Sequence, residues 1–384
     1  MTIDIYRDLQ ERLDLYSVGF PPTSSGIEIK VLKKLFSEND ASVFLNLTHL
    51  LELPEAVAGR LGLSVAKTEE KLADMADRGL LFSKNKEQKT MYGCTPFVHG
   101  IFEFQTNRVD REFVELMEQY NTEAFDQSMT KSAGSFLRTI PVQESIETEH
   151  KVASYDDAAE IIKSKETIVV TDCICRKSSN LLDQGCGKIV EACLMFDSMA
   201  EYYIRHDLGR QITVDEAIAM SKKGQKQGLV VQPATSRNPA GMCLCCGDCC
   251  GVLRAINSHP KPAEIVSSNH YAVLDSSTCT GCKVCVKRCQ TTALSMEESE
   301  IAVLNSDRCI GCGLCVTTCP GKSLSLMVKP KKKQYKLPSD SMDQMLAMAK
   351  KRMVFNPKFI FGNTIIQMRI MYRMLVKQLQ RVKS

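Results

Sequence analysis

Two runs of cysteine near the carboxyl end constrain this chain more than any other feature of its sequence. Each run has the spacing C-x2-C-x2-C-x3-C, and nineteen residues separate the two. Thiolates are ligands for soft metal ions and for iron-sulfur clusters, so a spacing that occurs twice indicates two related binding loops. The residues are Cys279, Cys282, Cys285 and Cys289 in the first run, and Cys309, Cys312, Cys315 and Cys319 in the second.

The spacing favours two four-iron, four-sulfur clusters whose ligands interleave. Three thiolates two residues apart converge on one cubane from a single loop, whereas the fourth lies too far along the chain and ligates the other cluster. Zinc is the alternative, but zinc sites usually pair two C-x2-C knuckles with four ligands in all. We therefore expect Cys279, Cys282, Cys285 and Cys319 to hold cluster I, and Cys309, Cys312, Cys315 and Cys289 to hold cluster II.

These eight positions resemble the bacterial-type two-cluster ferredoxins over residues 271–328. Gln290 departs from that family, which usually has a proline there, as Pro320 provides after the second run. The resemblance implies two short hairpins, two helices, a pseudo-twofold axis and one-electron transfer at low potential. We expect strands at 271–275 and 302–305, each leading into a ligand loop.

A second group of cysteines follows a β-branched segment at 167–171. Soft ligands favour an iron-sulfur cluster or zinc over harder metals. We expect one further cubane here, with zinc or free thiols as the alternatives, and Arg176 and Lys177 would either offset its negative charge or form a solvated edge. The four candidate ligands are Cys173, Cys175, Cys186 and Cys193.

A third group packs five cysteines between Gly241 and Gly251. Adjacent thiols at a glycine-bounded turn are reactive and prone to oxidation unless they are ligated. The group predicts either a fourth cluster or a combined site with the second group. Its members are Cys243, Cys245, Cys246, Cys249 and Cys250, of which Cys243, Cys246 and Cys249 repeat the C-x2-C-x2-C spacing.

The whole chain of 384 residues is expected to be a multidomain α+β protein. A C-x-C-Arg segment, a dense cysteine group and a two-cluster ferredoxin in one chain resemble the larger multidomain iron-sulfur proteins of anaerobes. The predicted parts are an N-terminal segment (1–26), a winged-helix-like domain (27–105), a helical connector (106–165), a cysteine-rich α/β region (166–270), the ferredoxin-like domain (271–328), and a basic linker with amphipathic helices (329–384).

The winged-helix resemblance rests on three helices followed by two short strands. Helical periodicity covers 27–36 and 53–61, and a third helix begins after Ser64 as N-cap and ends at Gly79. Its charged residues sum to a net acidic face, which suits a polyanion poorly. We therefore expect protein docking rather than nucleic-acid binding, although three lysines in the turn between the strands have the charge to contact phosphate: Lys84, Lys86 and Lys89.

The carboxyl end is basic and helical. Helices are expected at 342–353 and from about residue 363, where an apolar stripe runs beside a basic one. Such a helix contacts an anionic membrane surface or an acidic redox partner, or packs back on its own protein. The chain shows no signal peptide and no uncharged apolar run of membrane-spanning length. With eighteen cysteines, it is expected in a reducing cytoplasm, in part at the inner membrane face.

These patterns predict an electron-transfer protein that relays single low-potential electrons through at least two [4Fe-4S] clusters to or from a partner oxidoreductase. One alternative is a redox- or iron-sulfur-sensing winged-helix regulator. A second is a catalytic oxidoreductase subunit that binds substrate at an incompletely ligated cluster in segment 243–250. No nucleotide-binding or hydrolase motif is present, no catalytic residue is predicted, and the six histidines lack ligand spacing.

Overall fold

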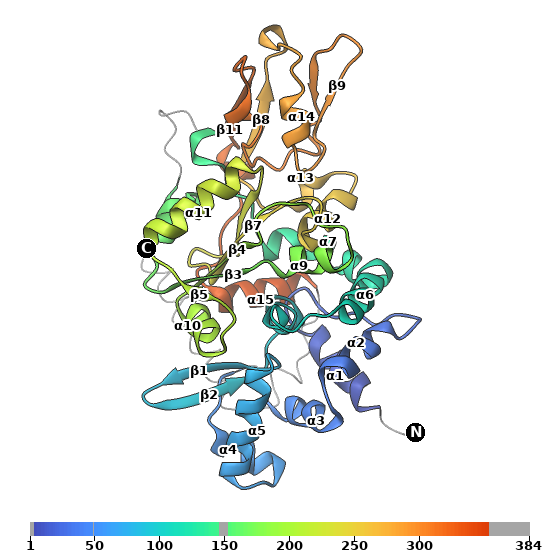
Figure 1. Cartoon of the computed structure of the whole chain (residues 1–384), viewed down its shortest axis with the longest axis vertical. Coiled ribbons are helices and arrows are strands. Elements are labelled where there is room, and N and C mark those ends of the chain that lie inside the picture. The colour runs from blue at the N-terminus through green and yellow to red at the C-terminus, as the bar shows by residue number, and fades with distance from the viewer. Residues whose placement is uncertain (1–3, 49, 146–152, 353–384) are drawn as a thin grey trace.

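The computed structural model describes residues 4–48, 50–145 and 153–352, which combine helices with four separate small sheets. Every strand pair in these ranges is antiparallel. The chain is elongated: helices α4 (Pro54–Leu61) and α5 (Val65–Asp77) lie near one end of the long axis and strands β8 (His270–Leu274) and β9 (Leu294–Met296) near the other (Figure 1). The mixture of helix and antiparallel sheet agrees with the expected α+β class.

The amino-terminal helices follow the predicted periodicity. The predicted helix after Ser64 is confirmed, because the Ser64 side chain accepts from the Lys67 N–H and Gly79 follows the helix with φ +74°. Two helices were not predicted, and one of them begins with a capping box formed by Ser37 and Asp40. The elements are α1 (Ile5–Asp14), α2 (Ile27–Leu35), α3 (Glu38–Asn46), α4, α5, β1 (Phe82–Lys86) and β2 (Lys89–Gly93).

The β1–β2 hairpin is docked on helix α10 (Ser198–Arg205) of the middle region. Phe82 stacks on Tyr202 with ring centroids 5.1 Å apart, and the Tyr202 hydroxyl lies 3.0 Å from the carbonyl oxygen of Leu81. Lys84 Nζ donates to Ser198 Oγ at 2.7 Å. The hairpin that the winged-helix resemblance assigns to a wing is thus part of an internal interface, and the winged-helix assignment itself stays a prediction.

Helices connect this part to the middle sheet. The last helix of the connector begins after Asp157, whose carboxylate accepts from the N–H of Ala159 at 2.8 Å. The segment before Pro141 is extended, and the Ile140 N–H donates to the Val231 carbonyl oxygen in strand β6 (Val230–Pro233). The elements are a π-helical turn (Phe97–Ile101), a 3-10 turn (Glu103–Gln105), α6 (Arg111–Tyr120), a second π turn (Asn121–Phe125), α7 (Asp126–Phe136), 3-10 turns Gln143–Ser145 and Ser154–Asp156, and α8 (Ala158–Lys163).

The middle region contains a five-stranded sheet in the order β5-β3-β4-β7-β6. The prediction of an α/β region at 166–270 was wrong, because that class usually has parallel strands. Here the chain reverses direction through α9 and returns beside β3 as the antiparallel strand β4. The elements are β3 (Ile168–Asp172), α9 (Ile174–Leu181), β4 (Glu191–Phe196), α10, β5 (Arg210–Gln211), α11 (Val214–Lys226), β6 (Val230–Pro233), β7 (Gly241–Cys245), α12 (Gly251–Ser258) and α13 (Pro262–Ile265).

The segment that carries the two cysteine runs forms a small unit with its own hydrophobic core. Both predicted strands are present, as β8 and β10 (Ala302–Leu304). One expected hairpin forms between β9 and β10, whereas the other strand pair joins the ends of the segment, β8 with β11 (Leu324–Val328). A 3-10 turn (Ser276–Thr278) precedes the first ligand loop, and short helical elements end the two loops: α14 (Val284–Arg288) in the first and a 3-10 turn (Val316–Thr318) in the second.

After these strands the chain returns to the amino-terminal half. A 3-10 turn (Lys331–Lys333) leads to helix α15 (Ser341–Lys351), where Met348 is buried in the largest hydrophobic core and Gln344 Nε2 donates to the carbonyl oxygen of Phe136. The predicted helix at 342–353 is thus present, and it is packed against α7. The amphipathic helix expected from about residue 363 lies outside the described residues. Among the helices described, none has the length and apolarity needed to cross a bilayer.

Candidate metal centres

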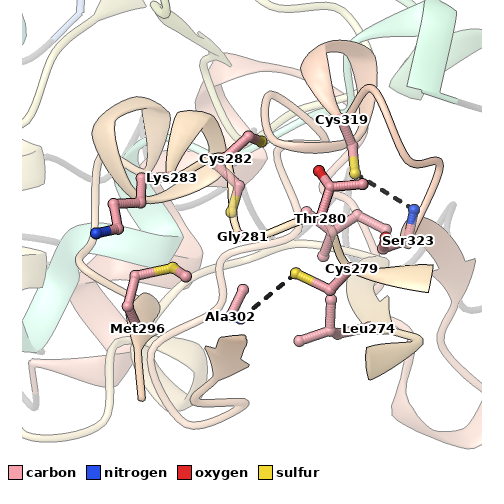
Figure 2. Close-up of a pocket in the computed structure, with 12 residues that line it drawn as sticks. Leu274, Cys279, Thr280, Gly281, Cys282, Lys283, Met296, Ala302, Cys319 and Ser323 are labelled. Atoms are coloured by element: carbon pink, nitrogen blue, oxygen red, sulfur yellow. Dashed lines mark hydrogen bonds between the residues drawn. The ribbon is translucent and has the colours of Figure 1, made fainter. Parts of the chain in front are cut away.

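Four cysteines from both runs surround one pocket in the carboxyl-proximal segment. Figure 2 shows Cys279 and Cys282 from the first loop facing Cys319, which arrives from the end of the second run, and Cys285 completes the lining. Gly281 permits the tight loop, since it has φ +67° and a Cβ there would lie 2.6 Å from the Glu300 carbonyl oxygen. The four thiols are the set expected for cluster I.

Backbone N–H groups point at the sulfur atoms in a pattern that repeats across the two halves. In the first pocket the Ala302 N–H donates to Cys279 Sγ at 3.5 Å and the Ser323 N–H to Cys319 Sγ at 3.3 Å (Figure 2). Hydrogen bonds of this kind stabilise a thiolate, and the Ala302 and Gly281 N–H groups lower the pKa of Cys279. The pocket thus offers what a cluster ligated by thiolates needs.

The second quartet has the matching arrangement. The N–H groups of Ala272 and Ala293 donate to Cys309 Sγ at 3.4 Å and Cys289 Sγ at 3.2 Å. Burial, together with the neighbouring thiols of Cys289 and Cys309, raises the pKa of Cys312 to about 12. These thiols therefore lie close together, as expected for cluster II.

The two quartets differ in their exposure to solvent. Cys282 of the first quartet is exposed, whereas Cys315 of the second is buried and Cys312 is largely covered. The loop around Cys312 is also tied to the rest of the protein, because the Val142 N–H donates to the Cys312 carbonyl oxygen at 3.0 Å. The first pocket therefore faces solvent and the second faces the middle region.

Two arginines, each one residue before a ligand of the second quartet, fasten this face to the middle region. Arg288 donates to the carbonyl oxygens of Gln225 and Lys226 at the end of α11, at 2.5 and 2.9 Å. Arg308 donates to the Asn257 carbonyl oxygen at 3.1 Å, near the end of α12. Helix carboxyl ends carry partial negative charge, so both contacts are favourable.

The upstream cysteines fall into a ring of six and a group of three. Each thiol in the ring lies close enough to the next to shift its pKa, and the ring closes on itself. All are free thiols, and four of the six are buried while Cys175 and Cys243 are half-buried. In order around the ring the residues are Cys173, Cys175, Cys250, Cys245, Cys243 and Cys193.

Strand geometry explains why the ring differs from the grouping by sequence spacing. Cys243 and Cys245 lie two residues apart on strand β7, so both side chains point to one face of the sheet. Cys193 on β4 is directly opposite Cys243 and shares that face. Cys173 and Cys250 are the N-cap residues of α9 and α12, which begin beside the sheet. The combined site that we considered for the two groups thus describes the arrangement better than two separate quartets.

Cys186, Cys246 and Cys249 form the second group, with their sulfur atoms all within 4.8 Å of one another. The sulfur atoms of Cys186 and Cys246 are 3.7 Å apart. Two thiolates on one tetrahedral zinc ion at about 2.3 Å lie roughly 3.8 Å apart, so the group has the spacing of a mononuclear site with one open position. The predicted quartet of Cys173, Cys175, Cys186 and Cys193 is therefore divided between the ring and this group.

Buried charge lies next to the ring. Arg176 is fully buried, and it donates to the carbonyl oxygens of Ile189 at 2.9 Å and Leu244 at 2.6 Å. Burial alone would lower its pKa, but the neighbouring Cys173, Cys246 and Cys245 raise the pKa above its ordinary value. The burial of Arg176 contradicts the solvated edge that was one of the two expectations for it. Lys177 instead pairs with Asp172 at 3.3 Å, and both side chains are partly exposed.

Three polar residues beside the ring were not predicted from the sequence. His99 lies beside the Cys243 thiol and lowers its pKa, and burial raises the pKa of the nearby Glu103 to about 6. Gln232 is fully buried opposite Cys243 on strand β6, and neither polar atom of its amide has a hydrogen-bond partner among the described residues. These residues are far from the cysteines in sequence and have no recognisable spacing, so only the fold brings them to the site.

Comparison with known proteins identifies the family of one segment. Residues 272–327 match the model of a family described as a 4Fe-4S dicluster domain. No curated protein and no solved structure matches the chain. The segment that carries the two cysteine runs is therefore an iron-sulfur, ferredoxin-like segment, and the comparisons assign nothing to the remaining residues.

Proposed function

We propose that this chain is an electron relay that exchanges single low-potential electrons with a partner oxidoreductase through two [4Fe-4S] clusters. The observation that carries the proposal is the pocket in which Cys319 from the second run joins Cys279, Cys282 and Cys285 from the first. That interleaved set is the ligand pattern of two-cluster segments. When bound, each cluster supplies reversible one-electron chemistry.

The protein's own residues set where electrons enter and how far they travel. Exposed Cys282 puts the first site within reach of a partner protein. The contacts of Arg288 and Arg308 hold the second site against α11 and α12, which lead to the cysteine ring. Backbone donors such as the Ala302 and Ala293 N–H groups, which bond to ligand sulfur atoms, tune the reduction potentials of the clusters. The direction of the relay is therefore from an exposed pocket toward the interior.

We keep the predicted domain boundaries as part of this proposal, together with a cytoplasmic location. The location rests on the eighteen free thiols, which persist in a reducing compartment. The partner is a redox protein of unspecified identity that docks at the exposed pocket. Docking at a membrane surface through the basic carboxyl-terminal helix concerns residues that the structure does not describe.

The regulator alternative is weaker in this structure. On the helix expected to read DNA, Lys71 Nζ lies 2.8 Å from an Asp40 carboxylate oxygen and Arg78 lies 2.7 Å from the same atom. The charges of Lys71 and Arg78 are thus paired with Asp40 within the protein, and Lys84 of the hairpin donates to Ser198. Because phosphate neutralisation dominates DNA affinity, these contacts favour a docking role for the amino-terminal region.

Interleaving gives a direct test. Cys289→Ala removes a residue of the first run but should destroy the cluster held by the second, so it should match Cys312→Ala and differ from Cys285→Ala. Each variant should lose about four irons, and paramagnetic resonance of the reduced proteins should show the same surviving cluster in the first two. If Cys289→Ala instead matches Cys285→Ala, each run holds its own metal and the interleaved relay is wrong.

A further inference from the structure

We propose that the six-thiol ring binds a polynuclear iron-sulfur cluster, which forms the inner end of the relay. This inference extends the proposed function, on which its electron-transfer role rests, but the metal site itself does not depend on it. Sequence spacing alone suggested a different quartet. The fold instead brings together thiols from three separate stretches, at 173–175, at 193 and at 243–250.

The number of thiols argues for more than one metal ion. A single tetrahedral ion takes four thiolates, whereas the ring holds six thiols, each beside its two neighbours. Six thiolates, four of them buried and two half-buried, also need more positive charge than the Arg176 guanidinium provides, because an unpaired buried charge is strongly disfavoured. Several metal ions would supply that charge, and thiolate-rich sites select iron-sulfur clusters and zinc.

Two helices begin at ring cysteines. Cys173 is the N-cap residue of α9, and Cys250 is the N-cap residue of α12. Both helices have eight residues, and their amino ends favour negative charge. Cys173 and Cys250, the two ring neighbours of Cys175, are thus placed where a helix amino end stabilises anionic sulfur.

Gln232 provides an independent sign that a group belongs in this space. It is fully buried and lies opposite Cys243, on the face of the sheet that carries the ring. Both its amide nitrogen and its amide oxygen lack a partner in the described part of the chain. Buried amides are nearly always hydrogen-bonded, so an acceptor such as a cluster sulfide is expected beside the Gln232 nitrogen.

Iron is favoured over zinc by what the ring adjoins. The loop between Cys246 and Cys249 contacts the iron-sulfur segment: the Gly247 N–H donates to Gln290 Oε1 at 2.7 Å, and Gln290 follows the predicted ligand Cys289. A redox-active cluster in the ring would extend the path of the electron beyond the second quartet. Zinc has no redox chemistry and would end it there.

The test measures iron, zinc and acid-labile sulfide in the full chain purified without oxygen. The proposal expects more iron than the roughly eight atoms that two cubanes hold, and a Mössbauer spectrum with a component beyond theirs. Cys243→Ser should remove that excess and leave the reduced-state resonance of the other two clusters. Cys94→Ser is the matched control, since Cys94 is a covered thiol bonded to the Phe44 carbonyl oxygen, outside both groups, and should keep all the iron.

Two further variants keep the result decisive if Cys243→Ser fails to fold. Gln232→Leu retains every ligand and should shift the spectrum or midpoint potential of the extra cluster alone. Cys186→Ser should leave the extra iron in place, because Cys186 belongs to the group of three.

Wild-type protein with about eight irons overturns the proposal, whether the ring then holds zinc or no metal. Loss of the extra iron in Cys186→Ser contradicts the division into two groups. Failure of the relay itself looks different: the chain would lack the eight irons that depend on Cys285 and Cys312, whatever the ring contains.

Discussion

The backbone N–H of Gly247 donates a 2.7 Å hydrogen bond to the side-chain oxygen of Gln290. The Gln290 carbonyl oxygen accepts a second bond, from Asn257 Nδ2 at 2.9 Å. Gln290 stands where the ferredoxin family usually has proline, and proline has no side-chain acceptor to offer. The glutamine at this position therefore links the iron-sulfur segment to the loop between Cys246 and Cys249.

Gln290→Ala tests whether that junction carries electrons. It removes the acceptor for the Gly247 N–H without touching a ligand, so iron content and cluster spectra should match the wild type. The rate of electron transfer from the iron-sulfur segment to the cluster proposed for the six-thiol ring should fall. Rapid-mixing spectroscopy after reduction measures this rate. Pro320→Ala is the matched control and should keep the wild-type rate. Equal rates in all three proteins would contradict a path through this contact.

Exposure of Cys282 predicts an order of cluster loss. On controlled exposure to oxygen, the cluster held by Cys279, Cys282, Cys285 and Cys319 should decay first, because its pocket faces solvent while Cys315 of the other quartet is buried. Alkylation of the released thiols followed by mass spectrometry should therefore label Cys282 before Cys312. Simultaneous labelling of both cysteines would contradict the inferred difference between the pockets.

Asp40 is predicted to matter for the stability of the amino-terminal helices. It is buried, caps α3 together with Ser37, and bonds Lys71 and Arg78. Burial by itself would raise its pKa, but these bonds hold the pKa of Asp40 well below its usual range. Asp40→Asn should destabilise the protein by about 1–2 kcal/mol, since the two cations reach solvent and are partly screened.

Chemical denaturation followed by circular dichroism measures that loss. Asp74→Asn is the matched control, because Asp74 pairs with the same Arg78 but its side chain is 52% exposed. Its cost should stay below about 0.5 kcal/mol. Equal effects of the two substitutions would mean that the buried cap contributes little.

DNA binding provides a test against the regulator alternative. The wild-type chain should give no sequence-selective shift of duplex DNA at about 0.15 M salt, in either redox state. Lys86→Ala with Lys89→Ala should change nothing, because a solvated turn explains these two lysines. A tight complex that disappears on cluster oxidation would instead support the regulator.

Much of the fold followed from local sequence signals. Ser64 and Gly79 mark the ends of α5 because capping is a local interaction, and β8 and β10 were expected before their ligand loops. Helices α1 and α3 were missed. They are short, and tertiary packing in the largest core stabilises them more than their periodicity indicates.

The site was predictable where its ligands share a loop and not where strands assemble it. For the eight cysteines of 279–319, the spacing alone predicts which thiols share a pocket, because loop geometry determines which thiols converge. The ring depends on the alternation of side chains along β7 and on the register that places Cys193 opposite Cys243. His99 and Gln232 reach the ring from other elements, so no pattern in the sequence identifies them.

The most direct test of the central claim is reductive titration of the full chain, purified without oxygen, with iron and sulfide measured on the same sample. We predict a brown protein with at least eight irons per chain and reversible one-electron reduction of two [4Fe-4S] clusters, and loss of about four irons in Cys282→Ala or Cys312→Ala. A colourless, iron-free protein, or a reducible chromophore that survives both substitutions, would contradict the claim.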